Sequence, residues 1–361
     1  MASGSKGGRR APSTGRGQRA GHGVAACAAL LIVGACGQRP GAILEPGPDA
    51  PAWPAPPDEA RIRYLGEFRT NQDLKPGRSF IQGVGRTLFG ATPATSMVGP
   101  MGVCTDDDRL FVADGAARVV HVFDLGSRRY DQWRPPEDVD RFMFPVDVVC
   151  DPTGRLLVSD SLAGAIYVFD LAGGFVGTLG DDRLERPVGM ALDDAGNVYV
   201  ADAGAHRVVA ISPTDEVVAT YGERGSEPGQ FNFPTYVAID SRGRLVVSDS
   251  LNFRVQVFDG EDGPARVVGE KGDMAGYFGQ PKGIAIDEHD RLFVVDAHFE
   301  AVQLFDEAGV LLMSFGREGR EAGEFWLPVG VHVDGRGRVF VADSYNRRVQ
   351  VFELLAQEIE P

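Results

Sequence analysis

One segment of this chain occurs six times, and this repeat limits the possible fold more than any other feature of the sequence. Each copy begins at a proline and ends at an aspartate 14 or 15 residues later. The final aspartates lie 46, 42, 47, 47 and 47 residues apart. A period of this length, with short strands in each unit, is typical of a β-propeller or a solenoid. The copies are residues 100–114, 145–160, 187–202, 234–249, 281–296 and 328–343.

Each repeat contains four short apolar runs. In the fourth repeat these are residues 236–239, 245–248, 255–258 and 266–269, and they are separated by turn residues such as Asp, Gly, Asn and Ser. Short runs that are rich in valine and isoleucine favour strands over helices. No helix-length apolar run lies between the repeats, which disfavours a solenoid of strands and helices. Four strands in one sheet make one propeller blade.

The two ends of the repeat region complement each other. The sixth repeat has only three strands, whereas residues 61–68 (RIRYLGEF) resemble the fourth strands of other repeats, such as residues 216–223 (EVVATYGE). We therefore predict an all-β fold, a six-bladed β-propeller of four-stranded blades whose last blade is closed by the N-terminal strand 61–68. The predicted blades lie near residues 100–134, 145–180, 187–222, 234–269, 281–316, and 328–353 with 61–68.

The repeats follow a recognisable consensus. Residues 231–258 and 325–352 fit the pattern F-x-x-P-x-x-[VI]-A-[VI]-D-x-x-G-x-L-x-V-x-D-S-x-N-x-R-V-Q-V-F best, and VADSYNRRVQVF is close to a consensus string. In this the chain resembles the NHL-repeat family, over about residues 61–352. The resemblance implies a propeller. NHL propellers include protein- and RNA-binding modules, sensor ectodomains and a few lyases, so the fold alone does not give the function.

The N-terminus has the pattern of an export signal. Residues 1–22 hold five basic and no acidic side chains, and an uncharged, mostly apolar segment at 23–35 precedes Cys36. This segment is too short to span a bilayer. The run Val33-Gly34-Ala35-Cys36 is similar to a bacterial lipobox, which implies a lipoprotein signal peptide at 1–35 and lipidation of Cys36. An ordinary cleaved signal is the alternative.

Two further segments precede the repeats. Residues 36–57 are rich in proline and predict an extended tether between the lipid and the propeller, which is expected at 58–356. The long insertion at 69–98 carries apolar residues and is expected to pack as a cap, with disorder as the alternative. Together these features predict an exported protein, lipid-anchored to a bacterial membrane, with the outer membrane, facing the periplasm, or the cell surface favoured.

The charge balance limits the partners. The chain has 51 acidic and 36 basic residues, and without residues 1–35 the remainder carries 31 basic side chains and a net charge of −20. Such a surface disfavours phosphate backbones, so we expect no nucleic-acid partner. A protein or peptide partner, a membrane reached through Cys36, and a monomeric state are expected.

Two cysteines lie in the repeats. Cys104 and Cys150 fall in the predicted first strands of consecutive blades, four and five residues after their aligned prolines, and so on opposite sides of their strands. They could meet across one interface or face different neighbours. We expect two buried thiols, although an exported protein permits a disulfide.

Comparison among the repeats separates structural from functional candidates. An aspartate ends the second strand of every blade, which indicates a turn-stabilising role. Other positions differ between blades near the end of the ring that carries the links between blades, which we call the mouth face. A mixed set of this kind suits a polar small molecule or a peptide, with solvated loop residues as the alternative. The candidate ligand-binding residues are Asp147, Tyr236, Lys282, His298 and Tyr345.

No motif in the chain marks a catalytic site. HExxH, CxxC, GxSxG and the phosphate-binding P-loop are all absent. We therefore predict a membrane-tethered binding or scaffold propeller, and assign no catalytic residue, metal or cofactor. The alternative is a metal-assisted lyase or a lactonase-like hydrolase. It would require Zn²⁺ or Ca²⁺ near the channel, with His332, His298 and Asp147 within reach of one another.

Overall fold

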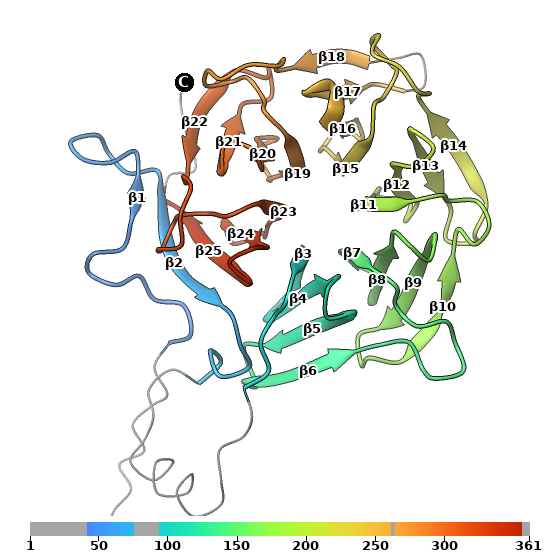
Figure 1. Ribbon diagram of the computed structural model, residues 1–361, viewed down its shortest axis with the longest axis horizontal. Coiled ribbons are helices and arrows are strands. Elements are labelled where there is room, and N and C mark those ends of the chain that lie inside the picture. Colours follow the sequence, from blue (N-terminus) through green and yellow to red (C-terminus); the bar gives the residue numbers. More distant parts are fainter. Residues whose placement is uncertain (1–41, 76–93, 261–263, 356–361) are drawn as a thin grey trace, which may run out of the picture. The chain divides into compact units, whose positions relative to one another are not determined.

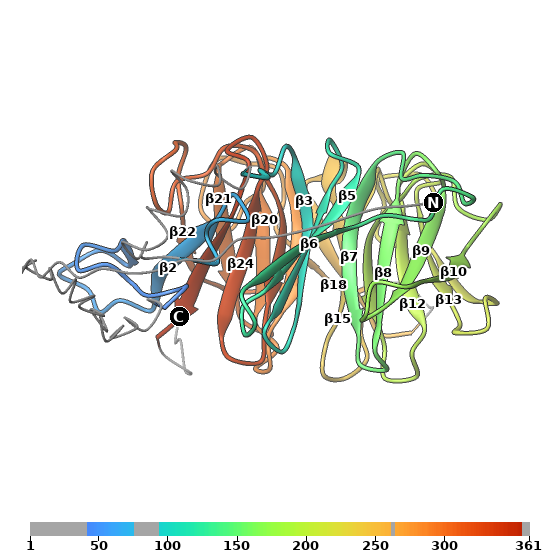
Figure 2. The same ribbon diagram turned by 90° about the horizontal axis from the view of Figure 1, so that it is seen from below.

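Six β-sheets surround a central axis. The computed structural model of the chain describes residues 42–75, 94–260 and 264–355. Within the compact unit 40–361, every sheet is antiparallel and radiates from the axis (Figure 1). Seen from the side, the strands run between two faces that carry the loops (Figure 2). This confirms the predicted all-β, six-bladed propeller.

The first five blades have four strands each, and the first strand of each blade lies nearest the axis. Blade 1 consists of β3 (Pro100–Asp106), β4 (Arg109–Asp114), β5 (Val119–Asp124) and β6 (Arg129–Trp133). Blade 2 consists of β7 (Pro145–Asp151), β8 (Arg155–Asp160), β9 (Ala165–Asp170) and β10 (Phe175–Leu179). Blade 3 consists of β11 (Pro187–Leu192), β12 (Val198–Asp202), β13 (Arg207–Ile211) and β14 (Val217–Tyr221).

The next two blades follow the same order. Blade 4 consists of β15 (Pro234–Ile239), β16 (Leu245–Asp249), β17 (Arg254–Phe258) and β18 (Pro264–Val268), with a short 3₁₀ turn η1 (Ser250–Asn252) after β16. Blade 5 consists of β19 (Pro281–Ile286), β20 (Leu292–Asp296), β21 (Ala301–Phe305) and β22 (Leu311–Phe315).

The middle strands of a blade are apolar on both faces because each blade packs between two others. In β8, for example, every residue except Arg155 is buried. One core cluster joins Phe111 and Val120 of blade 1 to Val158 and Tyr167 of blade 2. Burial on both faces removes the alternation of polar and apolar residues and leaves the short continuous runs seen in the sequence. The core is therefore a ring of interfaces between blades.

The repeated aspartates hold the entry to each blade. Asp160 is fully buried, and its carboxylate accepts hydrogen bonds from the backbone amides of Met143 (2.7 Å) and Phe144 (2.9 Å), just before β7. Asp202 accepts from the amide of Arg186 (2.8 Å) in the same way. A carboxylate that is buried against backbone amides replaces the water these groups lose. These aspartates are structural.

The last blade is closed by the N-terminal strand, as predicted. It contains β23 (Pro328–Val333), β24 (Arg338–Asp343), β25 (Arg348–Leu354), β2 (Ile62–Phe68) and β1 (Ala52–Trp53). β2 pairs with β25 in antiparallel register, and Figure 1 shows these two strands side by side. The pairing leaves neither strand with an open edge, because β1 adds a fifth strand outside β2.

A buried arginine fixes this closure. Arg348 in β25 is 1% exposed, and it donates to the carboxylates of Asp343 at 2.6 Å and of Glu67 at 2.7 Å. It also donates to the backbone carbonyls of Glu321 (2.9 Å) and Glu324 (2.7 Å). A buried guanidinium is tolerated only when its donors are matched in this way. One side chain thus binds β24, β2 and a loop to β25.

The segments before the repeats are described in part. Trp53 lies in the predicted tether 36–57 and packs against Phe315 and Phe352, with ring centroids 5.9 and 5.8 Å apart. Leu74 and Met97, in the insertion 69–98, are buried in the core beside blade 1. The predicted signal peptide 1–35, Cys36 and residues 76–93 lie outside the described residues. Among the described residues, no helix is long and apolar enough to cross a membrane.

The prediction of two free thiols is wrong. Cys104 in β3 and Cys150 in β7 form a disulfide, with their Cα atoms 6.1 Å apart. Their strands are innermost and adjacent. Since the two side chains point to opposite sides of their own strands, both enter the one interface between blades 1 and 2. The spacing from the aligned prolines predicts that the two side chains lie on opposite sides of their strands, but not which neighbouring blade each side faces.

We predict that Glu67→Ala lowers the free energy of unfolding by about 2 kcal/mol, because the buried Arg348 loses a charged acceptor. Glu353→Ala is the matched control on the same strand pair. Glu353 pairs with Arg63 at 2.7 Å, but both side chains are more than a third exposed, so the loss is below about 1 kcal/mol. Urea unfolding of both variants measures this, and equal losses would contradict the role given to Arg348.

We predict that Cys104→Ala/Cys150→Ala lowers the free energy of unfolding by about 4 kcal/mol, since the disulfide closes a loop of 46 residues. A reductant should destabilise the native chain and leave the double variant unchanged. Thiol titration in denaturant, on protein that starts at residue 40, should find no free thiol before reduction. Two reactive thiols there would show that the bond is absent.

Candidate functional site

A pocket of about 360 Å³ opens on the mouth face, at the centre of the ring. All six blades contribute to its wall the residue that follows the first proline of the innermost strand. Five of these residues are apolar or a threonine, and the sixth is a lysine. They are Met101, Val146, Val188, Thr235, Lys282 and Val329.

The rest of the lining comes from one side of the ring. Phe144, Arg186 and Phe233 lie in the links that enter blades 2, 3 and 4, and Ser161 and Leu162 lie in the turn after β8. The pocket is therefore lined mainly by apolar side chains, and among the described residues no carboxylate lines it. Concave apolar walls with a few polar groups are the usual form of a small-molecule site.

Lys282 is the one lysine of this wall. It is half-buried, and burial lowers the pKa of its ammonium group. Within the described ranges it has no ion pair. Desolvation without a compensating carboxylate disfavours the charged form of a lysine. Because no ion pair with a described residue occupies it, the Lys282 side chain is free to pair with an anionic group of a ligand.

Tyr236 also lines the pocket and is 4% exposed. Its hydroxyl group is buried and has no hydrogen-bond partner among the residues that the structure describes. Burial, and then the charge of Asp147, raise the pKa of this hydroxyl well above its usual value. The phenol is therefore neutral, and it is a donor that the protein leaves without an acceptor.

Asp147 lies in the channel but does not line the pocket. It is 6% exposed, and its carboxylate accepts a hydrogen bond from the amide of Met190 in the next blade at 2.9 Å. Burial raises the pKa of this carboxyl to about 7. The contact between the innermost strands of blades 2 and 3, β7 and β11, thus includes a carboxyl group whose pKa is raised to about 7.

The position of Asp147 and Tyr236 is occupied by glycine in the other four blades, and the geometry explains why. A Cβ atom on Gly102 would lie 2.5 Å from the Cα of Asp147, and one on Gly189 would lie 2.6 Å from the Cα of Tyr236. Neighbouring innermost strands therefore approach too closely for two side chains. Asp147 and Tyr236 each fit because the blade before them carries a glycine.

The other two sequence candidates lie outside this pocket. His298 is exposed and stacks on Phe299, with ring centroids 5.4 Å apart. Tyr345 is 61% exposed and stacks on Trp326 at 5.6 Å, and Arg320 lies 4.5 Å from the same indole ring. The structure brings together Tyr236 and Lys282, but neither His298 nor Tyr345 joins them.

The histidine proposed for the metal alternative has a different partner. His332 Nε2 lies 2.9 Å from the hydroxyl of Thr105, and burial lowers the pKa of His332 to about 4. In the described part of the chain, no group of three histidine, cysteine or carboxylate residues is placed to hold a metal ion. His332, His298 and Asp147 do not converge.

Comparison of the repeats missed three lining residues, Phe144, Arg186 and Phe233. All three directly precede an aligned proline, a position at which the other blades carry Gly99, Gln280 and Leu327. The two phenylalanines and the arginine differ from the glycine, glutamine and leucine of the other blades, and this difference is visible in the sequence. It would have pointed to the same side of the ring.

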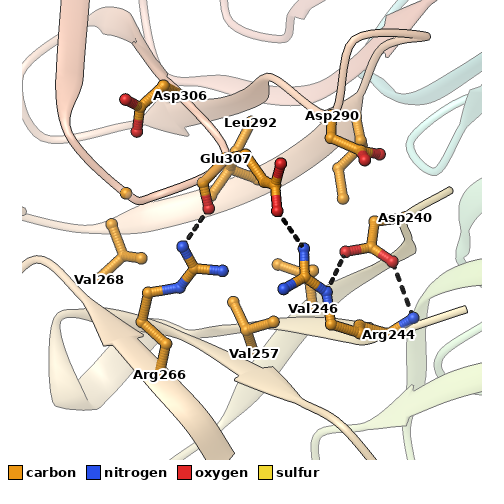
Figure 3. A pocket seen from close by; sticks show the side chains of 12 residues that line it. Asp240, Arg244, Val246, Val257, Arg266, Val268, Asp290, Leu292, Asp306 and Glu307 are labelled. Carbon is orange, nitrogen blue, oxygen red and sulfur yellow. Dashed lines mark hydrogen bonds and ion pairs between the residues drawn. The ribbon is translucent and has the colours of Figure 1, made fainter. Parts of the chain in front are cut away.

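A second cavity, of about 20 Å³, lies between blades 4 and 5 and is structural. Figure 3 shows Glu307 between Arg244 and Arg266, and Asp240 beside Arg244. Arg244 donates to Asp240 at 2.6 Å and lies 3.5 Å from Glu307, while Arg266 donates to the Glu307 carbonyl. The space holds about one water molecule, which is too little for a ligand. The charged residues around it therefore stabilise the interface between blades 4 and 5.

The sequence profile of the NHL repeat matches residues 184–211, 231–258 and 325–352, in blades 3, 4 and 6. With the six blades described above, the chain is an NHL-repeat β-propeller. A comparison with curated protein sequences finds no match.

Solved structures of similar shape share the fold. Virginiamycin B lyase from Staphylococcus aureus is 14% identical, with a TM-score of 0.53 over 72% of this chain and 96% of its own. An auxiliary nutrient binding protein from Bacteroides thetaiotaomicron is 10% identical, with a TM-score of 0.56 over 71% and 69%. A protein of unknown function from the same organism is 15% identical, with a TM-score of 0.56 over 72% and 70%.

We predict that Asp147→Asn stabilises the protein at pH 8 by on the order of 3 kcal/mol and has little effect below pH 4. The native carboxyl has its pKa raised from 3.8 to about 7, so it holds a proton that the unfolded chain releases between these values. The native chain therefore loses stability as pH rises from about 4 to 7, and the amide avoids that loss.

The control for this prediction is Asp151→Asn in the same strand. The Asp151 carboxylate accepts from Arg155 Nε at 2.8 Å and its pKa is lowered, with hydrogen bonds from Thr153 and Arg155 outweighing burial. That variant should be less stable at neutral pH, and its deficit should shrink in acid. Urea midpoints across this pH range test both variants. If the urea midpoints of Asp147→Asn and of the native chain differ by the same amount at every pH, the raised pKa of Asp147 is contradicted.

Proposed function

We propose that this chain is an exported, monomeric binding propeller that takes a small, largely apolar molecule into the pocket on its mouth face. The observation that carries the proposal is the pocket of about 360 Å³, whose wall is built by all six blades. This volume lies in the range of small-molecule sites. Of the ligands expected from the sequence, a protein, a peptide or a small polar molecule, the volume and concave form of the pocket favour a small molecule.

The wall of the pocket is held before any ligand arrives. Val146 and Thr235 are 4% and 3% exposed, and the Thr235 hydroxyl lies 2.7 Å from that of Ser250. Ser250 in turn donates to the carbonyl of Pro281 in the next blade. A site on strands that are fixed by their neighbours loses little conformational freedom on binding, which favours affinity.

The proposal includes a lipid anchor at Cys36, towards the periplasm or the cell surface. Between Cys36 and Ile43, which packs against the core cluster that contains Leu65 and Phe68, lie six residues. At about 3.1 Å per residue, an extended tether of this length reaches about 20 Å. β1 pairs with β2, so the tether ends on the outer edge of blade 6. The pocket would thus be kept near the membrane surface.

A lyase or a lactonase-like hydrolase is the alternative function. The similarity to virginiamycin B lyase supports the fold alone, and so does the similarity to an auxiliary nutrient binding protein. Binding has precedence because the pocket offers apolar walls and an unpaired cation, whereas the residues named for metal-assisted chemistry do not converge within the described chain.

We expect the neutral fluorescent probe N-phenylnaphthylamine to bind at one site per chain, and Leu162→Trp to weaken this binding at least tenfold. Leu162 is 57% exposed and lines the pocket, so an indole there narrows the mouth without disturbing the core. The matched control is Leu251→Trp. Leu251 follows the second-strand aspartate by two residues in blade 4, as Leu162 does in blade 2, and it is 46% exposed but does not line the pocket.

Fluorescence titration of the native chain and both variants measures the effect. The proposal predicts that Leu162→Trp binds the probe at least tenfold more weakly than the native chain and that Leu251→Trp binds it with unchanged affinity. If the probe does not bind the native chain, or if both variants bind as well as the native chain, the pocket is not a ligand site.

A further inference from the structure

The charge of the pocket is opposite to the charge of the protein. The chain has 51 acidic and 36 basic residues. The pocket is nevertheless lined by two cations, Lys282 in the wall and Arg186 at the rim, and by no carboxylate of the described residues. Neither cation has an ion pair with a described residue.

Packing does not require a lysine at this position. The equivalent residues in the other blades are Met101, Val146, Val188, Thr235 and Val329, so an apolar or small side chain completes the wall elsewhere. Desolvation is the only effect that shifts the pKa of Lys282, and it lowers it. A half-buried cation without a partner costs stability compared with a methionine or valine.

We propose that the pocket selects a small molecule with an apolar body and one acidic group, whose oxyanion pairs with the ammonium group of Lys282. This inference rests on the proposed binding function and specifies its ligand. The apolar walls take the body of the molecule. A charge-assisted hydrogen bond to a partly desolvated ammonium is stronger than a neutral one, so the acidic group sets the specificity.

Tyr236 supplies a second donor. Its side chain lines the same pocket as Lys282, and its buried hydroxyl has no acceptor among the described residues. A buried hydroxyl without a partner is costly, and a ligand oxyanion provides the missing acceptor. Tyr236 and Lys282 come from the innermost strands of consecutive blades, β15 and β19, which lie side by side.

The test uses two probes with the same ring system. Anilinonaphthalene sulfonate carries an acidic group, and N-phenylnaphthylamine lacks it. We expect the native chain to prefer the sulfonate. Lys282→Met should weaken sulfonate binding about 10- to 100-fold and change binding of the neutral probe less than threefold. Lys282→Arg should retain the preference. Lys271→Met is the control, because Lys271 is exposed on a loop outside the pocket and its loss changes net charge equally.

Tyr236→Phe separates the ligand role of the hydroxyl from a structural one. Removal of an unsatisfied buried hydroxyl should leave thermal stability unchanged or raised, while sulfonate affinity falls at least threefold. If both probes bind and depend on Leu162, but Lys282→Met weakens them equally, the pocket binds ligands without selecting an acid and the inference fails. If neither probe depends on Leu162, the proposed function itself fails.

Discussion

The antiparallel pairing of β2 with β25 is the interaction on which the rest of the structure depends. It joins Arg63 to Glu353, 290 positions apart in the chain, and so turns a linear series of repeats into a ring. A ring fixes how far each innermost strand lies from the axis, because no blade can move outward without opening an interface with its neighbours. The pocket exists only under this constraint, since all six innermost strands line it.

Close approach at the axis then decides which residues are exposed to a ligand. Where glycine occupies the second position after the proline, the neighbouring strand fills the space, as the contact of Gly330 with the backbone of Met101 and Gly102 shows. Asp147 and Tyr236 are the two side chains admitted at this level. Asp147 binds the backbone of blade 3, whereas Tyr236 retains a free donor.

The fold could be predicted because its signal repeats along the sequence, and even the closing strand at 61–68 could be recognised by its likeness to other fourth strands. Part of the site could be predicted by the same comparison, which found Tyr236 and Lys282. The rest of the site depends on how neighbouring blades pack and are oriented relative to each other. Leu162 and Tyr345 occupy equivalent turn positions, yet only Leu162 lines the pocket. The disulfide was missed for the same reason, because strand parity does not reveal which neighbour a side chain faces.

The repeats also show which features folding does not explain. The aspartates that end the second strands recur because every blade needs a carboxylate for the amides at its entry, as Asp160 and Asp202 show. Lys282, in contrast, does not recur. The other five blades complete the same wall with an uncharged residue, and only blade 5 has a charged group there, which burial disfavours. A charge that costs stability and has no partner in the described protein is explained by a partner outside it. In an acidic chain whose pocket is lined by no carboxylate of the described residues, we infer that this partner is an anion.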